Sequence, residues 1–193
     1  GKSALSGEKV TPEVVRYGLM DELDVSVSLV VIEAIPGAGK QTLVHQWARR
    51  QVPEHRMVIE VPAALADSVD LVGLVWNRLS EHLQLGAMPE DESEFLAGMC
   101  SATSRLRRPI AVAVTGTHDL DEAAYEPLLK VVSAVSGVRL IVSCFDAGAI
   151  RRAAERHAVP YALLDDRNLR LTPAETGELF DLHGVAAPEQ AVL

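Results

Sequence analysis

Short apolar runs alternate with helical periods along most of the chain. The first run, residues 25–34, is rich in valine and isoleucine and predicts a buried strand. In residues 40–51 apolar side chains recur at helical spacing, and Pro53 ends the predicted helix. The alternation continues, with strands predicted at residues 57–61, 109–114, 138–143 and 161–164 and helices at residues 12–23, 69–85, 92–106, 122–134 and 147–156.

This alternation defines the expected fold class. The predicted strands are apolar throughout rather than at every second position, which is typical of strands buried on both faces of a parallel sheet. Strands that alternate with helices place those helices on the two faces of the sheet. The sequence therefore predicts an α/β fold in three layers, with a parallel sheet of about five strands.

Length and composition predict one main domain. A chain of 193 residues that is 48% apolar can bury one substantial core. We expect residues 1–10 to form a flexible leader and residues 11–172 to form the α/β domain. The motif Thr172-Pro173-Ala174-Glu175 is a capping box that starts a last helix, which Gly184 can end. Residues 173–193 are expected to begin a following helical region that is truncated.

The charge of the chain limits its partners. A net charge of −9 and a pI near 5.1 oppose contact with nucleic-acid phosphates, so this segment is not expected to bind nucleic acid directly. The two cysteines have no metal-like spacing and predict no disulfide framework. Charges interrupt each apolar stretch before the ~18 residues of a membrane span. We expect a cytoplasmic protein.

The segment PGAGK, residues 36–40, follows the first predicted strand and precedes its helix. In a three-layer α/β sheet this position collects ligands, because helix N-termini present free N–H groups there. Two glycines let successive amides face one anion, and a lysine at a helix start is favourable beside a phosphate. The residues predicted to hold a nucleotide are Pro36, Gly37, Ala38, Gly39, Lys40, Gln41 and Thr42.

Two positions depart from the usual phosphate loop, G-x-x-x-x-G-K-[ST]. Ala34 stands at the first glycine position, and Gln41 stands where a hydroxyl normally binds Mg²⁺, with Thr42 one residue later. The phosphate cradle is expected to be intact, whereas the metal ligand is altered. The alternative interpretation is a glycine-rich turn that only joins a strand to a helix.

With its flanks, this segment resembles the nucleotide-binding domain of the STAND class of signal-transduction ATPases, in particular the large ATP-binding LuxR-type, or MalT-like, transcriptional regulators. The matching stretches are RYGLMDEL, LVVIEAIPGAGKQTLVHQWARR, PIAVAVTGTHDLDEAAYEPLLKVVS, VRLIVSC and LRLTPAETGELFDLHGV. The resemblance implies a P-loop NTPase fold that binds ATP or ADP, with Mg²⁺ where its ligands are kept. It also implies partners in the other domains of a full-length regulator.

The same resemblance indicates that hydrolysis is impaired. The family carries an acidic pair at the end of the third strand, before a histidine; aligning His118 with that histidine puts Thr115 and Gly116 at the acidic positions. Neither can orient water or bind a metal strongly. Cys144 stands near the position of a family arginine. Asp119 and Asp121 are interpreted as the cap and dipole partner of the next helix.

Three functions remain open at this point. The first is a nucleotide-binding regulatory module with weak or no hydrolysis, which has no assigned catalytic residue and no assigned metal ligand. The second is an active P-loop ATPase or small-molecule kinase, which needs a carboxylate at the end of the third strand. The third is an interaction scaffold that keeps the fold but binds no nucleotide.

Other conspicuous side chains receive structural interpretations. His118 and Cys144 lack a third group to orient them as base and nucleophile, so Cys144 is expected to be packed. Trp47 and Trp76 lie on apolar helical faces and are expected in the core. His45 is expected at the surface of the helix that follows the phosphate loop.

Overall fold

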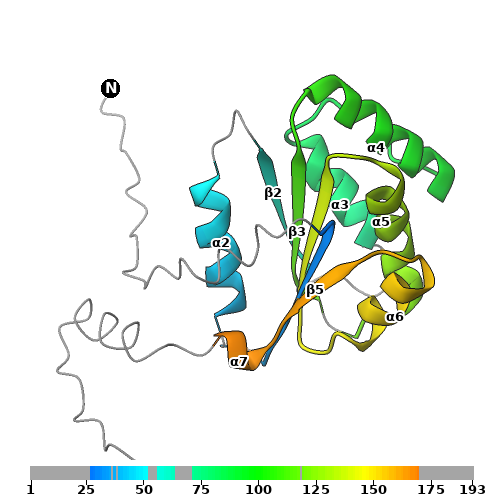
Figure 1. The fold of residues 1–193 in the computed structure, drawn as a ribbon. Helices are drawn as coiled ribbons and strands as arrows, with labels where there is room; N and C mark the ends of the chain where they lie inside the picture. Colours follow the sequence, from blue (N-terminus) through cyan, green and yellow to red (C-terminus); the bar gives the residue numbers. More distant parts are fainter. Residues whose placement is uncertain are drawn as a thin grey trace, which may run out of the picture. The chain divides into compact units, whose positions relative to one another are not determined.

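Five strands form the central sheet of the computed structural model, which describes residues 27–35, 37, 39–51, 56–63, 71–117 and 119–169 (Figure 1). All described residues belong to one unit, Gly18–Arg170. The strands are β1 (Leu29–Glu33), β2 (Met57–Pro62), β3 (Ile110–Thr117), β4 (Val138–Cys144) and β5 (Tyr161–Leu164). The helices are α2 (Lys40–Arg50), α3 (Leu71–Ser80), α4 (Glu92–Leu106), α5 (Glu122–Ala134), α6 (Gly148–Arg156) and α7 (Asp166–Leu169).

Every described strand pair is parallel, and the strand order is β2-β3-β4-β1-β5. Helices cover both faces, with α2 and α7 on one side and α3 to α6 on the other (Figure 1). The predicted α/β class, three layers and five parallel strands are therefore confirmed. None of the described helices is both long enough and apolar enough to cross a membrane.

Burial on two faces explains the unbroken apolar sequence of β1. Leu29 and Val31 belong to the core on the side of α3 to α6, whereas Val30 and Ile32 pack with α2. All four side chains have no exposed surface. A strand in this position gains from apolar side chains at every residue, because neither face meets water.

The strand order determines where a ligand can lie. The chain leaves β1 toward α2 on one face of the sheet and leaves β4, its neighbour, toward α6 on the other face. Loops that diverge in this way open a crevice at the carboxyl ends of adjacent parallel strands. The ends of β1, β4 and β3 therefore define the edge that carries the candidate site.

Most predicted element boundaries agree with the structure within two residues. The helix predicted at 69–85 is the main exception, because α3 ends at Ser80 and a turn follows. The short helix α7 was absent from the sequence prediction. The predicted helices at residues 12–23 and after Thr172 lie outside the described residues.

Candidate functional site

The loop between β1 and α2 contains two glycines in left-handed conformations. The φ angles are 84° at Gly37 and 90° at Gly39, which residues with a Cβ rarely adopt. A Cβ at either position would meet no heavy atom within 4 Å, so backbone conformation rather than space requires glycine. The predicted site residues Pro36 and Ala38 lie outside the described residues.

The N-terminus of α2 is open to an anion. Gly39 is the N-cap and has no side chain to accept the free N–H groups, and the first helical turn holds no acidic residue. Such a helix start presents unpaired donors and the positive end of the helix dipole. The side chains of Gln41 and Thr42 are exposed in this first turn, where a ligand at the helix start can meet them.

Lys40 bends back toward its own loop. Its Nζ donates a hydrogen bond to the backbone oxygen of Ala34, at the end of the same strand that the loop follows. Burial lowers the pKa of the Lys40 ammonium, while the nearby Cys144 and Asp166 raise it. The ammonium is thus bonded to a neutral carbonyl at the end of β1, and its contact with a phosphate stays a prediction.

Asp166 is a member of this site that the sequence analysis missed. The backbone N–H of Ile35 donates to its Oδ1 at 3.3 Å, although the two residues are 131 positions apart. The contact exists because β5 pairs with β1 in parallel, so that the start of α7 meets the start of the loop. No local motif could have shown this, since only the strand order joins the two segments.

The end of β3 lacks carboxylates, as the alignment of the sequence predicted. Thr115 is buried, and the pairing of β3 with β4 shifts between Val114 and Thr117. Gly116 lies in this irregular stretch with a φ of 74°, and its N–H donates to Ser143 Oγ at 3.1 Å. Neither Thr115 nor Gly116 can serve as a base or a strong metal ligand.

Asp121 has the structural role predicted for it. It is the N-cap of α5, and its Oδ1 accepts a hydrogen bond from the N–H of Ala124 at 3.0 Å. Asp119 has a left-handed φ of 50° and no hydrogen bond among the described residues. Asp121 is therefore the cap of the predicted cap and dipole partner, and the dipole role of Asp119 stays a prediction. His118 lies outside the described residues.

Cys144 is a packing residue. It is 1% exposed, and burial together with the nearby Glu33 raises the pKa of its thiol to about 12. A thiol with this pKa is protonated at neutral pH and is a poor nucleophile. The prediction that Cys144 packs in the interior is confirmed, and a catalytic thiol at this position is not supported.

The two tryptophans lie in the core, and His45 lies at the surface, as the sequence predicted. Trp47 and Trp76 are buried, at 0% and 4% exposure, and belong to the cores on opposite faces of the sheet. The side chain of His45 is 53% exposed and contacts Glu60 through Nδ1 at 3.3 Å. None of these three groups lines the loop between β1 and α2.

The side chains near the loop do not offer an ordinary Mg²⁺ site. Mg²⁺ in phosphate-handling proteins is held by hydroxyl or carboxylate oxygens together with the phosphates. Here the corresponding positions carry the Gln41 amide, Thr115 and Gly116, and the described residues contain no cluster of three metal-ligating side chains.

Comparisons with solved structures identify the class of this fold. The chain is similar to the Walker-type ATPase of Pyrococcus abyssi (10% identity, TM-score 0.53, 93% of this chain and 63% of that one) and to Cdc6p from Pyrobaculum aerophilum (9%, 0.61, 93% and 51%). It is also similar to a STAND protein with a tetratricopeptide repeat sensor from Pyrococcus horikoshii (13%, 0.55, 93% and 27%). No protein-family model and no curated protein sequence matches the chain.

The chain therefore has the fold of a P-loop NTPase domain. In the sequence, the PGAGK segment follows β1 and ends at the first residue of α2. A STAND protein is among the proteins that share this fold. The chain spans 63% or less of each of the three proteins named above, so their complete activities do not transfer to it.

Proposed function

We propose that this chain is the ATP- or ADP-binding regulatory module of a LuxR-type transcriptional regulator of the STAND class, with weak or no hydrolysis. The observation that carries the proposal is the loop after β1, where two left-handed glycines lead into an uncapped helix that begins with Lys40. Amides from Gly37 to Thr42 would hold the phosphates, and the Lys40 ammonium would neutralise part of their charge.

Weak hydrolysis follows from the residues at the end of β3. Phosphoryl transfer to water needs a group that orients the water and a metal that offsets the developing charge. Thr115 and Gly116 supply neither, and Gln41 replaces the hydroxyl that would hold Mg²⁺. Bound nucleotide would then act as a structural signal, with a lifetime determined by dissociation rather than by turnover.

The proposed partners are the nucleotide and the other domains of a cytoplasmic regulator. The net charge of −9 opposes direct nucleic-acid binding by this segment. The similar chains of the Drosophila origin recognition complex occur in structures with DNA, at 13% identity. Because that likeness concerns the fold alone, the DNA contact is a property of those proteins.

One observation favours the scaffold alternative. Lys40 is already bonded to the Ala34 oxygen, so a phosphate must compete with an internal hydrogen bond. A neutral carbonyl is a weaker partner for an ammonium than a phosphate, which favours exchange when nucleotide is present. An interaction scaffold would show no saturable binding of ADP or ATP.

A titration with fluorescent ADP and ATP, each with and without Mg²⁺, tests the proposed function. We expect saturable binding of both nucleotides and an affinity that Mg²⁺ changes by less than about threefold, because the usual metal ligands are replaced. Phosphate release measured at full occupancy should stay near the rate without protein. Steady Mg²⁺-dependent release would instead establish the ATPase alternative, and lack of binding would establish the scaffold.

Asp166→Asn is expected to tighten nucleotide binding. The carboxylate of Asp166 lies at the start of the loop and repels phosphates, whereas an asparagine oxygen can still accept the Ile35 N–H. Because Asp166 is exposed, we expect a modest gain, about two- to fivefold in Kd, that shrinks as salt is added. Fluorescent-ADP titrations at low and high ionic strength measure both effects.

Asp165→Asn is the matched control for this change. The carboxylate of Asp165 accepts the Arg167 N–H at 3.0 Å and pairs with the Arg167 guanidinium at 3.3 Å. Both variants remove one negative charge from neighbouring positions, and of the two aspartates only Asp166 hydrogen-bonds to a described residue of the loop. Equal gains for the two variants would mean that net charge, rather than the contact with the loop, controls affinity.

A further inference from the structure

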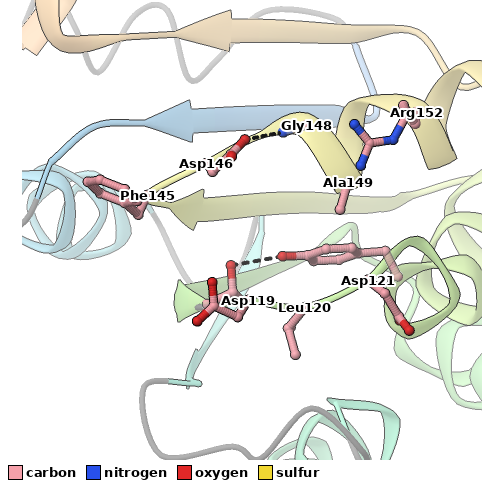
Figure 2. A pocket seen from close by; sticks show the side chains of 10 residues that line it. Asp119, Leu120, Asp121, Phe145, Asp146, Gly148, Ala149 and Arg152 are labelled. Atoms are coloured by element: carbon pink, nitrogen blue, oxygen red, sulfur yellow. Dashed lines mark hydrogen bonds between the residues drawn. The ribbon is translucent and has the colours of Figure 1, made fainter.

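A second cavity opens at the carboxyl edge of the sheet, between the β3–α5 loop and the β4–α6 loop. Its volume is about 360 Å³. Figure 2 shows Asp119, Leu120 and Asp121 on one side of it and Phe145, Asp146, Gly148 and Ala149 on the other. None of the described residues of the β1–α2 loop lines this cavity, which separates it from the described part of the proposed nucleotide site. The volume is in the range of small-ligand sites.

The floor of the cavity is polar and uncharged. The Tyr125 hydroxyl donates a hydrogen bond to Thr117 Oγ1 at 2.9 Å. Thr117 Oγ1 in turn donates a hydrogen bond to the backbone oxygen of Ser143 at 3.4 Å. Burial raises the pKa of Tyr125 to about 12, so the phenol is neutral at physiological pH. These hydroxyl groups are engaged with each other and contribute no charge to a ligand.

The rim is negatively charged. It carries three carboxylates, those of Asp119, Asp121 and Asp146, and one cation, Arg152. The Arg152 Nε pairs with Glu122 Oε1 at 2.6 Å, and Arg156 pairs with the other oxygen of the same carboxylate. A Cβ at Gly148 would lie 3.0 Å from Arg152 Nη1 and 3.1 Å from Asp146 Oδ1, so the guanidinium also lies near Asp146 and offsets part of the negative charge of the rim. Asp146 uses Oδ1 to accept the Gly148 N–H at 2.8 Å, and no described residue hydrogen-bonds to its second oxygen.

An exposed aromatic ring forms part of the wall. Phe145 is 54% exposed and is among the residues that line the cavity. Leu120 and Ala149 extend the apolar surface inside it. An aromatic ring that lines the same cavity as carboxylates favours a ligand that is both cationic and partly apolar, because the ring attracts a cation and packs against a hydrocarbon stem.

The arrangement does not suit a metal ion. A hard cation needs several oxygens that converge on one point at 2.0–2.6 Å. The carboxylates of the rim come from two separate loops, and the described part of the chain has no group of three side chains placed to hold a metal. An organic cation, which is larger and binds through separate contacts, fits the spacing better.

We propose that the cavity between the β3–α5 and β4–α6 loops binds an organic monocation, a guanidinium or ammonium group on a short hydrocarbon stem. The charged group lies between the Asp119 and Asp146 carboxylates, and the stem packs on Phe145. A free amine and the arginine or lysine side chain of a partner protein share this chemistry. The site goes beyond the proposed function, since it requires no nucleotide.

Butylguanidinium and its neutral analogue butylurea are matched probes for this site. We expect butylguanidinium to shift the backbone amide resonances of residues 119–121 and 145–149 of the full ¹⁵N-labelled chain saturably, with a Kd on the order of 1 mM. Butylurea has nearly the same shape without the charge and should bind at least about tenfold more weakly. The double variant Asp119→Asn, Asp146→Asn should raise the Kd by about tenfold, and Phe145→Ala by about threefold.

Two control variants separate this site from general effects. Glu81→Gln removes an exposed carboxylate that pairs with Arg78 away from the cavity, and it should leave the Kd unchanged. Lys40→Ala should also leave it unchanged, so that failure of nucleotide binding and failure of cation binding are distinguishable. An unshifted spectrum at tens of millimolar probe, or equal Kd values for the native chain and the double aspartate variant, would overturn the proposal.

A comparison of butylguanidinium with a blocked Gly-Arg-Gly peptide identifies the source of the cation. Tighter binding of a blocked Gly-Arg-Gly peptide than of butylguanidinium assigns the cavity to the side chain of a partner protein. Binding of butylguanidinium alone assigns it to a free small-molecule cation, because the peptide backbone then fails to fit between the two loops. Either result supports a cation site, and failure of both probes rejects it.

Discussion

Lys40→Ala is expected to weaken the binding of ADP and ATP by about 30- to 100-fold. A half-buried ammonium that bonds a phosphate contributes about 2 to 3 kcal/mol, and the loop amides that remain still hold part of the anion. The fold should survive, because Lys40 makes one described hydrogen bond, to the Ala34 oxygen, and that oxygen can bind water instead. Fluorescent-nucleotide titration measures the affinity, and circular dichroism checks the fold.

Lys130→Ala is the matched control for this prediction. Lys130 is an exposed lysine on α5 whose ammonium pairs with Glu92 on α4 at 2.5 Å. The substitution Lys130→Ala changes the net charge by the same amount as Lys40→Ala. Lys130 lies on α5, on the other face of the sheet from α2. If both alanine variants bound nucleotide as tightly as the native chain, Lys40 would not be part of the site and the proposed function would lose its main support.

Trp47→Ala is expected to lower the free energy of unfolding by about 3 to 5 kcal/mol, as is typical of truncating a large buried aromatic residue. Trp47 has no exposed surface and packs α2 against the sheet with Leu43 and Val44. Its ring also has the guanidinium carbons of Arg56 and Arg139 at 5.6 and 5.9 Å from its centroid. The loss is a large share of the 5–15 kcal/mol that stabilises an ordinary domain.

Urea unfolding followed by circular dichroism measures this loss without relying on the fluorescence of the removed indole. His45→Ala, two residues earlier on the exposed side of the same helix, serves as the comparison and should change the free energy of unfolding by less than about 0.5 kcal/mol. A change below about 1 kcal/mol for Trp47→Ala would contradict the burial of this ring. Because α2 follows the phosphate loop directly, the same variant should also weaken nucleotide binding.

The helices and strands were largely predictable because their signals are local. The apolar run before PGAGK indicates a buried strand, and the helical spacing of Leu43, Val44 and Trp47 indicates a buried helix face. Each signal lies within a short stretch of the sequence. The helix α5 has the same bounds in the prediction and in the structure, because Asp121 caps its start as the pattern indicated. By contrast, α7 has only four residues and is too short to carry a period.

The candidate site was predictable only in part. The positions of Gly37, Gly39 and Lys40 follow from a motif of consecutive residues, and the structure gives both glycines the conformations that this motif needs. The contact of Asp166 with Ile35 joins residues 131 positions apart, and nothing in either segment indicates the other. The place of Asp119 on the rim of a cavity between two loops was likewise not predicted, since the two loops are far apart in the sequence.

The sequence alone determined the α/β class, because the class depends on residue types at short spacing. For the same reason it predicts the place of a phosphate loop, and it carries no carboxylate at residues 115 and 116. Only the tertiary structure decided the strand order β2-β3-β4-β1-β5, and with it which loops meet at one edge of the sheet. Which strands pair depends on how the sheet packs against both layers of helices. The strand order is therefore determined by the whole core and not by any single segment. That order brings Asp166 to the phosphate loop and places Asp119 opposite Asp146 across the cavity.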